Sequence, residues 1–155
     1  MNNDRRQLVD NIRIAIASLK TDEEVYRHTV ELIDGFSENY NWTGVYVMKD
    51  GLLEVGPYIG PETPHTRIEL NQGICGAAAS EKKTIRVDDV KADPRFLACS
   101  LSTRSEIVVP LMDGETVLGQ IDIDSNQPSY FSSEDQVMLE EIARVVVERL
   151  KRIVR

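Results

Sequence analysis

The chain has few of the residues that mark metal sites or disulfide frameworks. It holds two cysteines and two histidines among 155 residues. There is no CxxC pair and no helical pair of histidines, so the sequence does not predict a bound metal. No apolar run is long enough to cross a bilayer, and the opening MNNDRRQLVD lacks the apolar stretch of a signal peptide. We therefore expect a soluble protein of the cytoplasm whose thiols stay reduced.

Positive charge is also scarce. The chain has 18 Lys and Arg against 26 Asp and Glu, a net charge of −8. A surface of that sign repels phosphate backbones, which argues against nucleic acid as a partner, whereas a small cationic or zwitterionic ligand is compatible with it. The remaining composition, 41% hydrophobic and 28% charged, is typical of a globular protein. We expect one domain over residues 1–155.

Hydrophobic periodicity and turn signals predict an α+β domain. Helical spacing or capping patterns predict helices at residues 5–19, 21–39, 73–81 and 132–153. β-branched and aromatic runs, two pairs of them joined by Asp-Gly turns, predict strands at residues 42–49, 52–58, 67–70, 84–87, 105–111 and 115–124. Because hairpins join antiparallel strands, we expect an antiparallel sheet.

Two thiols are candidates for chemistry. Cys75 lies between glycines near a predicted helix start, where free backbone N–H groups and the helix dipole lower the pKa of a thiol. Cys99 lies in a long connection, residues 88–104, that shows no period. The alternative for each is a small, inert, buried side chain, the commoner fate of an intracellular cysteine. The residues alone favour that alternative for Cys75, and a function for Cys99 rests on the resemblance described below.

Three acidic residues, Glu106, Asp122 and Asp124, interrupt strands that otherwise consist of core residues. A carboxylate on a sheet face is costly unless it is paired, solvated or lining a pocket, so a wet face and a pocket remain as alternatives. Trp42 and Tyr46 also share one strand face. Their periodicity favours core packing, and the alternative is a ligand-binding wall beside the acids.

Four runs occur in a distinctive order: Asn41-Trp42-Thr43-Gly44-Val45-Tyr46, Gly73-Ile74-Cys75-Gly76-Ala77-Ala78, Ser105-Glu106-Ile107-Val108-Val109-Pro110-Leu111 and Asp122-Ile123-Asp124-Ser125. Together they resemble the free methionine-(R)-sulfoxide reductases, which are built on a stand-alone GAF domain, over about residues 20 to 150. The resemblance implies a central six-stranded antiparallel sheet, with terminal helices packed on one side that often form a dimer. On the other side it implies a small pocket under a loop.

The resemblance also implies roles for the candidate residues. Cys99 matches the family's nucleophilic cysteine, and Cys75 matches the Gly-x-Cys-Gly cysteine, which would attack the oxidised nucleophile. The family usually has a further, resolving cysteine before that run, and His65 takes its place here. The residues that match the family's substrate pocket are the aromatic wall Trp42 and Tyr46 and the acidic ligands Glu106, Asp122 and Asp124. Glu106 or Asp124 would protonate the leaving oxygen.

The implied activity is the thiol-dependent reduction of free L-methionine-(R)-sulfoxide to L-methionine. We expect no bound cofactor, an external thiol reductant such as thioredoxin, and a homodimer. One alternative is a non-catalytic GAF module that senses a small ligand, and another is a dimerisation domain with a vestigial pocket. Cys99 discriminates between them, because a sensor has no need of an accessible thiol of low pKa.

Overall fold

The computed structural model describes residues 1–97 and 101–155, so Cys99 lies outside the described residues. Its helices are α1 (Asn3–Ile16), α2 (Asp22–Asp34), α3 (Gly73–Glu81) and α4 (Ser133–Arg152), with a short 3-10 turn η1 (Val90–Ala92). Its strands are β1 (Trp42–Lys49), β2 (Leu52–Ile59), β3 (Arg67–Glu69), β4 (Ile85–Val87), β5 (Ser105–Asp113) and β6 (Thr116–Ser125). They form one antiparallel sheet in the order β3-β2-β1-β6-β5-β4.

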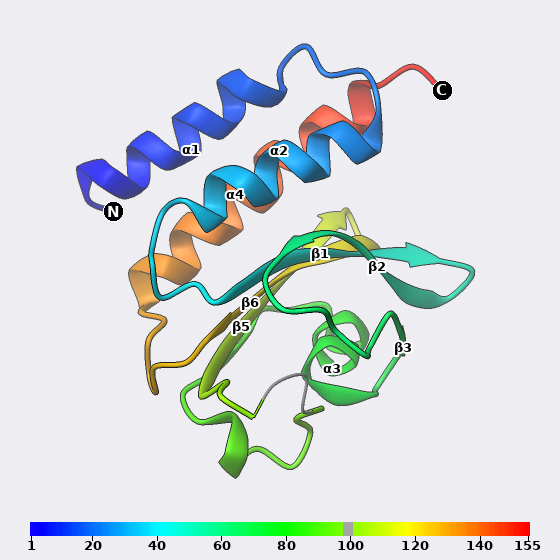
Figure 1. Ribbon diagram of the computed structural model, residues 1–155. Coiled ribbons are helices and arrows are strands. Elements are labelled where there is room, and N and C mark those ends of the chain that lie inside the picture. The colour runs from blue at the N-terminus through cyan, green and yellow to red at the C-terminus, as the bar shows by residue number, and fades with distance from the viewer. Residues whose placement is uncertain (98–100) are drawn as a thin grey trace.

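Helices α1, α2 and α4 lie on one side of the sheet, where α2 and α4 pack against the strands and α1 packs against α2 and α4 (Figure 1). The odd-numbered residues of the central strands point to this side, and Val45, Ile107 and Ile121 pack there against the apolar stripes of the helices. Side chains cap the N-termini of three helices, α1, α2 and α4. The Thr21 hydroxyl accepts from the Glu24 amide at 3.2 Å, and Ser132 and Asp135 form a reciprocal capping box.

The opposite face carries α3 and the loops around it (Figure 1). Unlike the other helices, α3 has no polar stripe, and its residues 74–79 are buried. It also lies very close to the chain that precedes it. A Cβ on Gly76 would lie 2.5 Å from the Glu69 carbonyl oxygen, so only glycine allows this approach. This close approach places the first turn of α3, which contains Cys75, over the central strands.

The architecture predicted from the resemblance is confirmed, with terminal helices on one side of a six-stranded antiparallel sheet. Element ends differ in places. The second helix was expected to reach residue 39 but ends at Asp34, because Gly35 begins a series of tight turns in which Phe36 N–H bonds to Ile33 O. The connection at residues 88–104 contains η1, whose start is capped by the Asp89 side chain. None of the helices in the described ranges is long and apolar enough to cross a membrane.

The layer between sheet and helices generates a stability prediction. Ile142 of α4 is fully buried there, whereas Val137 of the same helix is 47% exposed. We expect Ile142→Ala to lower the free energy of unfolding by about 2–5 kcal/mol through lost burial and a residual cavity. Val137→Ala should change it by less than about 0.5 kcal/mol. Urea unfolding followed by circular dichroism measures both, and similar midpoints for the two variants would contradict this packing.

Candidate active site

Three acidic side chains meet on the sheet face opposite the helical layer. Glu106 of β5 lies directly across from Asp124 of β6, and Asp122 is two residues along β6 on the same face. Each is only 5% exposed. The wet-face alternative is therefore wrong. Trp42 of β1 pairs with Asp124, and Tyr46 lines the same small cavity as Glu106 and Asp122.

Burial sets the protonation of the three acids. The pKa values of Glu106 and Asp124 lie well above their usual range, first because burial penalises the charged form and then because of the charge on Asp122. The pKa of Asp122 is also raised by burial, but hydrogen bonds from Glu106 and Cys75 stabilise its anion and oppose that shift. The arrangement therefore favours a proton on Glu106 or Asp124 and the negative charge on Asp122.

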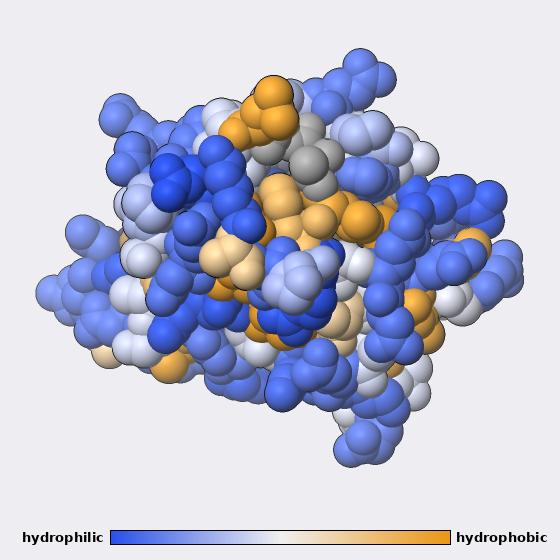
Figure 2. All heavy atoms as spheres, turned by 90° about the horizontal axis from the view of Figure 1, so that it is seen from below, coloured by the Kyte–Doolittle hydropathy of each residue, from blue (hydrophilic) through white to orange (hydrophobic). Residues whose placement is uncertain are grey.

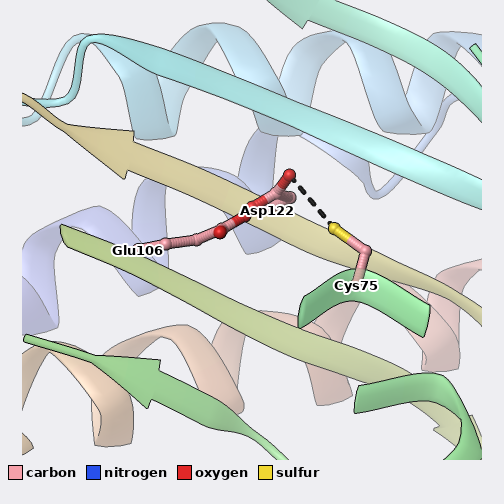
Figure 3. A group of neighbouring side chains, drawn as sticks. All are labelled: Cys75, Glu106 and Asp122. Atoms are coloured by element: carbon pink, nitrogen blue, oxygen red, sulfur yellow. Dashed lines mark hydrogen bonds between the residues drawn. The ribbon is translucent and has the colours of Figure 1, made fainter. Parts of the chain in front are cut away.

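Cys75 joins this cluster from the first turn of α3 (Figure 3). Its thiol donates to Asp122 Oδ2, with 3.3 Å between sulfur and oxygen. Burial raises the pKa of this thiol well above its usual value, and the charges of Asp122 and Glu106 add to the effect. The expectation that the helix start lowers the pKa of Cys75 is thus wrong, because desolvation and nearby carboxylates outweigh the dipole. Cys75 is a protonated hydrogen-bond donor here.

The aromatic wall is built from three rings. The Trp42 ring stacks on Tyr46 at 6.1 Å and on Tyr58 at 5.1 Å between centroids. Tyr58 of β2 was not singled out in the sequence, although it lies opposite Gly44. That pairing holds the signal, because a Cβ on Gly44 would lie 2.5 Å from the Trp42 ring and 2.7 Å from the Tyr58 Cβ. Glycine at this position lets the rings gather.

The same rings hold the loop that follows β2. The Trp42 indole Nε1–H donates to the Pro61 carbonyl at 3.1 Å, and the Tyr46 hydroxyl donates to the His65 carbonyl at 3.0 Å. Residues of this loop, 60–66, therefore lie over the edge of the aromatic wall. The loop-covered pocket that we expected on this side of the sheet is the region between this loop, α3 and the acids.

Two hollows open among these residues. A cleft of about 160 Å³ is lined by Asn41, Trp42, Pro61, Ser102, Thr103, Asp124 and Asn126. A smaller cavity of about 20 Å³ is lined by Tyr46, His65, Ile68, Gly73, Ile74, Cys75, Leu97, Glu106 and Asp122. Seen from this side, hydrophobic residues gather near the centre of the face and hydrophilic residues surround them (Figure 2). A larger groove of about 440 Å³ beside α4 contains none of the predicted site residues.

All the predicted site residues that the structure describes converge on this face. Trp42, Tyr46 and Cys75 surround the acids, and Cys99 lies outside the described residues. A six-stranded antiparallel sheet with terminal helices on one side, and with α3 and a loop on the other, is the architecture of a GAF domain. The GAF domain family model matches residues 22–150.

Comparison with known proteins narrows this class. The chain is 34% identical to the free methionine-R-sulfoxide reductase of Escherichia coli over 66% of its own length and 61% of that relative, so it spans less than two thirds of that protein. Two solved free methionine-R-sulfoxide reductases share its fold. That of Neisseria meningitidis, in complex with its substrate, has a TM-score of 0.91 and 29% identity over 97% of this chain and 92% of that one. That of Thermoplasma acidophilum, described as type II, has a TM-score of 0.79 and 34% identity over 86% and 97%.

The chain belongs to the free methionine-R-sulfoxide reductase family of GAF domains. A further similar structure is a protein of Burkholderia vietnamiensis described as a putative GAF sensor, with a TM-score of 0.89 and 33% identity over 94% of this chain and 92% of that one.

The buried acids generate a pH prediction. Because the pKa of Glu106 is raised in the folded protein, the folded state binds more protons than the unfolded chain between the two pKa values. Its free energy of unfolding therefore falls as pH rises through that interval. We expect Glu106→Gln to raise the melting temperature relative to wild type near pH 8, with a smaller gain near pH 4. The exposed Glu115→Gln is the matched control, and a gain that does not depend on pH would contradict the assignment.

Proposed function

We propose that this protein reduces free L-methionine-(R)-sulfoxide to L-methionine. The observation that carries the proposal is the convergence of three buried carboxyl groups and a stacked aromatic wall on one sheet face, in a fold that matches a substrate-bound reductase of this family. Two binding features of that face suit the two ends of the substrate. It offers negative charge for an ammonium group and polarisable rings for sulfur.

The substrate is bound through opposite ends of its structure. Its ammonium group pairs with the carboxylate charge that the cluster places on Asp122, because the described part of the chain forms no ion pair with the three acids. Its methyl and sulfur end packs on Trp42 and Tyr46, since sulfur interacts favourably with aromatic rings. The space lies in the cleft of about 160 Å³ lined by Trp42 and Asp124 and in the cavity of about 20 Å³ lined by Tyr46 and Asp122.

The chemistry transfers one oxygen atom between two sulfur atoms. The thiolate of Cys99 attacks the sulfoxide sulfur while Glu106 or Asp124 protonates its oxygen. The oxygen ends on Cys99 as a sulfenic acid, and methionine leaves with its sulfur reduced by two electrons. The raised pKa values of Glu106 and Asp124 support their role as the acid, because burial favours the protonated form of each carboxyl group, which has a proton to give.

Cys99 is proposed as the nucleophile on two grounds. It matches the reactive cysteine of the family that the sequence resembles. In addition, described residues on both sides of it face the candidate site. Leu97 lines the small cavity with Cys75, and Thr103 lines the cleft with Trp42.

Substitution of the nucleophile tests this proposal. With reductant present, wild type should release methionine from the (R)-sulfoxide over many turnovers. Cys99→Ser should lower that rate by about 1,000-fold or more, because a hydroxyl cannot replace the thiolate. Mass spectrometry of wild type treated without reductant should find one added oxygen, or a disulfide, at Cys99. A wild type that releases less than one methionine per chain and keeps Cys99 unmodified would contradict the enzyme proposal.

Cys75 is proposed to reset the oxidised enzyme. Attack of its thiolate on the Cys99 sulfenic acid would form a disulfide and release water, and an external thiol such as thioredoxin would reduce that disulfide. Asp122, which already accepts the thiol hydrogen bond, is placed to take the proton. Because burial raises the pKa of Cys75, its proton must leave before the thiolate can attack.

A second substitution separates resetting from reduction. Cys75→Ser should still release about one methionine per chain in a single turnover, but it should lose turnover driven by thioredoxin. A small thiol such as dithiothreitol should restore part of it, because it reaches the sulfenic acid directly. Unchanged turnover of Cys75→Ser with thioredoxin would show that Cys75 does not resolve Cys99.

A sensory function is the second candidate. It is favoured by His65, which stands where the family's extra cysteine is expected, and by similarity to a putative GAF sensor. Such a protein would bind methionine or its sulfoxide without consuming it. Binding measured by calorimetry, together with no release of methionine, would support it. A homodimer and a cytoplasmic location remain part of the proposal, and light scattering of the purified protein measures the former.

A further inference from the structure

The acid cluster and Cys75 together form a second kind of site. The candidate ligand atoms of Cys75, Glu106 and Asp122 all lie within 4.8 Å of one another, and all three residues are buried. They come from three different elements, α3, β5 and β6, and their side chains point toward one another (Figure 3). The sequence disfavoured a metal because it lacks paired cysteines and histidines, but the fold brings these three ligands together from distant positions.

Two buried oxygen atoms in this cluster accept no hydrogen bond from any described group outside it. Asp122 Oδ1 and Asp124 Oδ1 have no amide, hydroxyl or amine partner in the part of the chain that the structure describes. Within the cluster, only a proton shared from a neighbouring carboxyl group can serve them. Buried carboxylate oxygens without donors are costly, and a bound cation removes that cost. The adjoining cavity of about 20 Å³ has room for one water-sized occupant.

We propose that Cys75, Glu106 and Asp122 bind a soft divalent cation, Zn²⁺ or Cd²⁺, through the sulfur of Cys75 and one oxygen of each carboxylate. Three protein ligands leave a fourth, open position of the tetrahedron for water. The thiolate selects against Mg²⁺ and Ca²⁺, which take oxygen ligands. The charge of Asp124, directly across from Glu106, adds further attraction for a cation.

Metal binding at this site replaces protons with the ion. The metal takes the place of the Cys75 thiol proton and of the proton held among the carboxyl groups, and both protons leave to water. The consequence for activity rests on the proposed function. The ion occupies the carboxylates that would hold the substrate ammonium group, so it inhibits in competition with methionine sulfoxide.

Cadmium binding to a variant without Cys99 tests the site independently of catalysis. In Cys99→Ser, Cys75 is the only thiol left. Titration with Cd²⁺ should produce the ultraviolet charge-transfer band of a Cd–thiolate bond and saturate at one ion per chain. It should also raise the melting temperature, because the ion binds the folded protein. Excess Ca²⁺ should not displace the Cd²⁺.

Two matched pairs of variants assign the ligands. Adding Cys75→Ser to Cys99→Ser should abolish the band and weaken Cd²⁺ binding by about 100-fold. Glu106→Gln, made in Cys99→Ser, should weaken binding by about tenfold or more, whereas Glu115→Gln should leave it unchanged. Circular dichroism confirms that each variant is folded.

The outcomes are separable from those of the proposed function. No band in folded Cys99→Ser, or equal Cd²⁺ affinity with and without Cys75, would overturn the metal site whether or not wild type reduces methionine sulfoxide. A band with the expected ligand dependence supports the metal site even if wild type shows no reductase activity. If wild type is active, inhibition by Zn²⁺ that substrate does not relieve would overturn the competitive mode.

Discussion

Three carboxyl groups are buried on one face of a sheet with no cationic side chain paired to them in the described chain, and most of the remaining architecture answers this constraint. The described salt bridges all lie elsewhere, at α1, α4 and the outer loops among other places. Such a cluster lowers the stability of the empty protein unless protons or a cation are taken up. The same cluster is ready to bind a positively charged ligand, because only a proton has to be displaced from it.

The surrounding elements keep this cluster out of water. Above it lies α3, drawn close by Gly76, with the Cys75 thiol bonded to Asp122. Beside it stand the stacked rings of Trp42, Tyr46 and Tyr58. Because water is excluded, each charge in the site acts with greater strength than it would at the surface. The same exclusion that raises the pKa of a carboxyl group also strengthens its attraction for an ammonium group or a metal ion.

How far the sequence predicts this structure depends on the range of the interactions involved. Hairpins follow from local turn chemistry, and the Asp-Gly signals at residues 50–51 and 113–114 predict both of them. The second turn lies one residue later than its signal, because Asp113 still belongs to β5 and pairs with Thr116 of β6. Strand alternation put Asp122 and Asp124 on one face, but it did not reveal what covers that face, because α3 and the loop at residues 60–66 are distant in sequence. The sequence predicts a lowered pKa for Cys75, and this is wrong for the same reason. The helix start is a local signal, whereas the acids that oppose it come from β5 and β6.

The runs that resemble the family predict the site residues, which periodicity alone does not. They include Trp42, Tyr46, Cys75 and the three acids, and these residues do converge. The sequence does not predict the role of Tyr58, because that role depends on its pairing with Gly44 across the hairpin. This pairing is known only from the register of β1 and β2.

The Tyr46 hydroxyl holds the loop through the main-chain carbonyl of His65 and not through its side chain. Any residue at position 65 supplies the same carbonyl group. A substitution at position 65 therefore leaves the acceptor of this hydrogen bond in place, because the backbone supplies it. The hydrogen bond ties the position of the loop to the aromatic wall through the main chain.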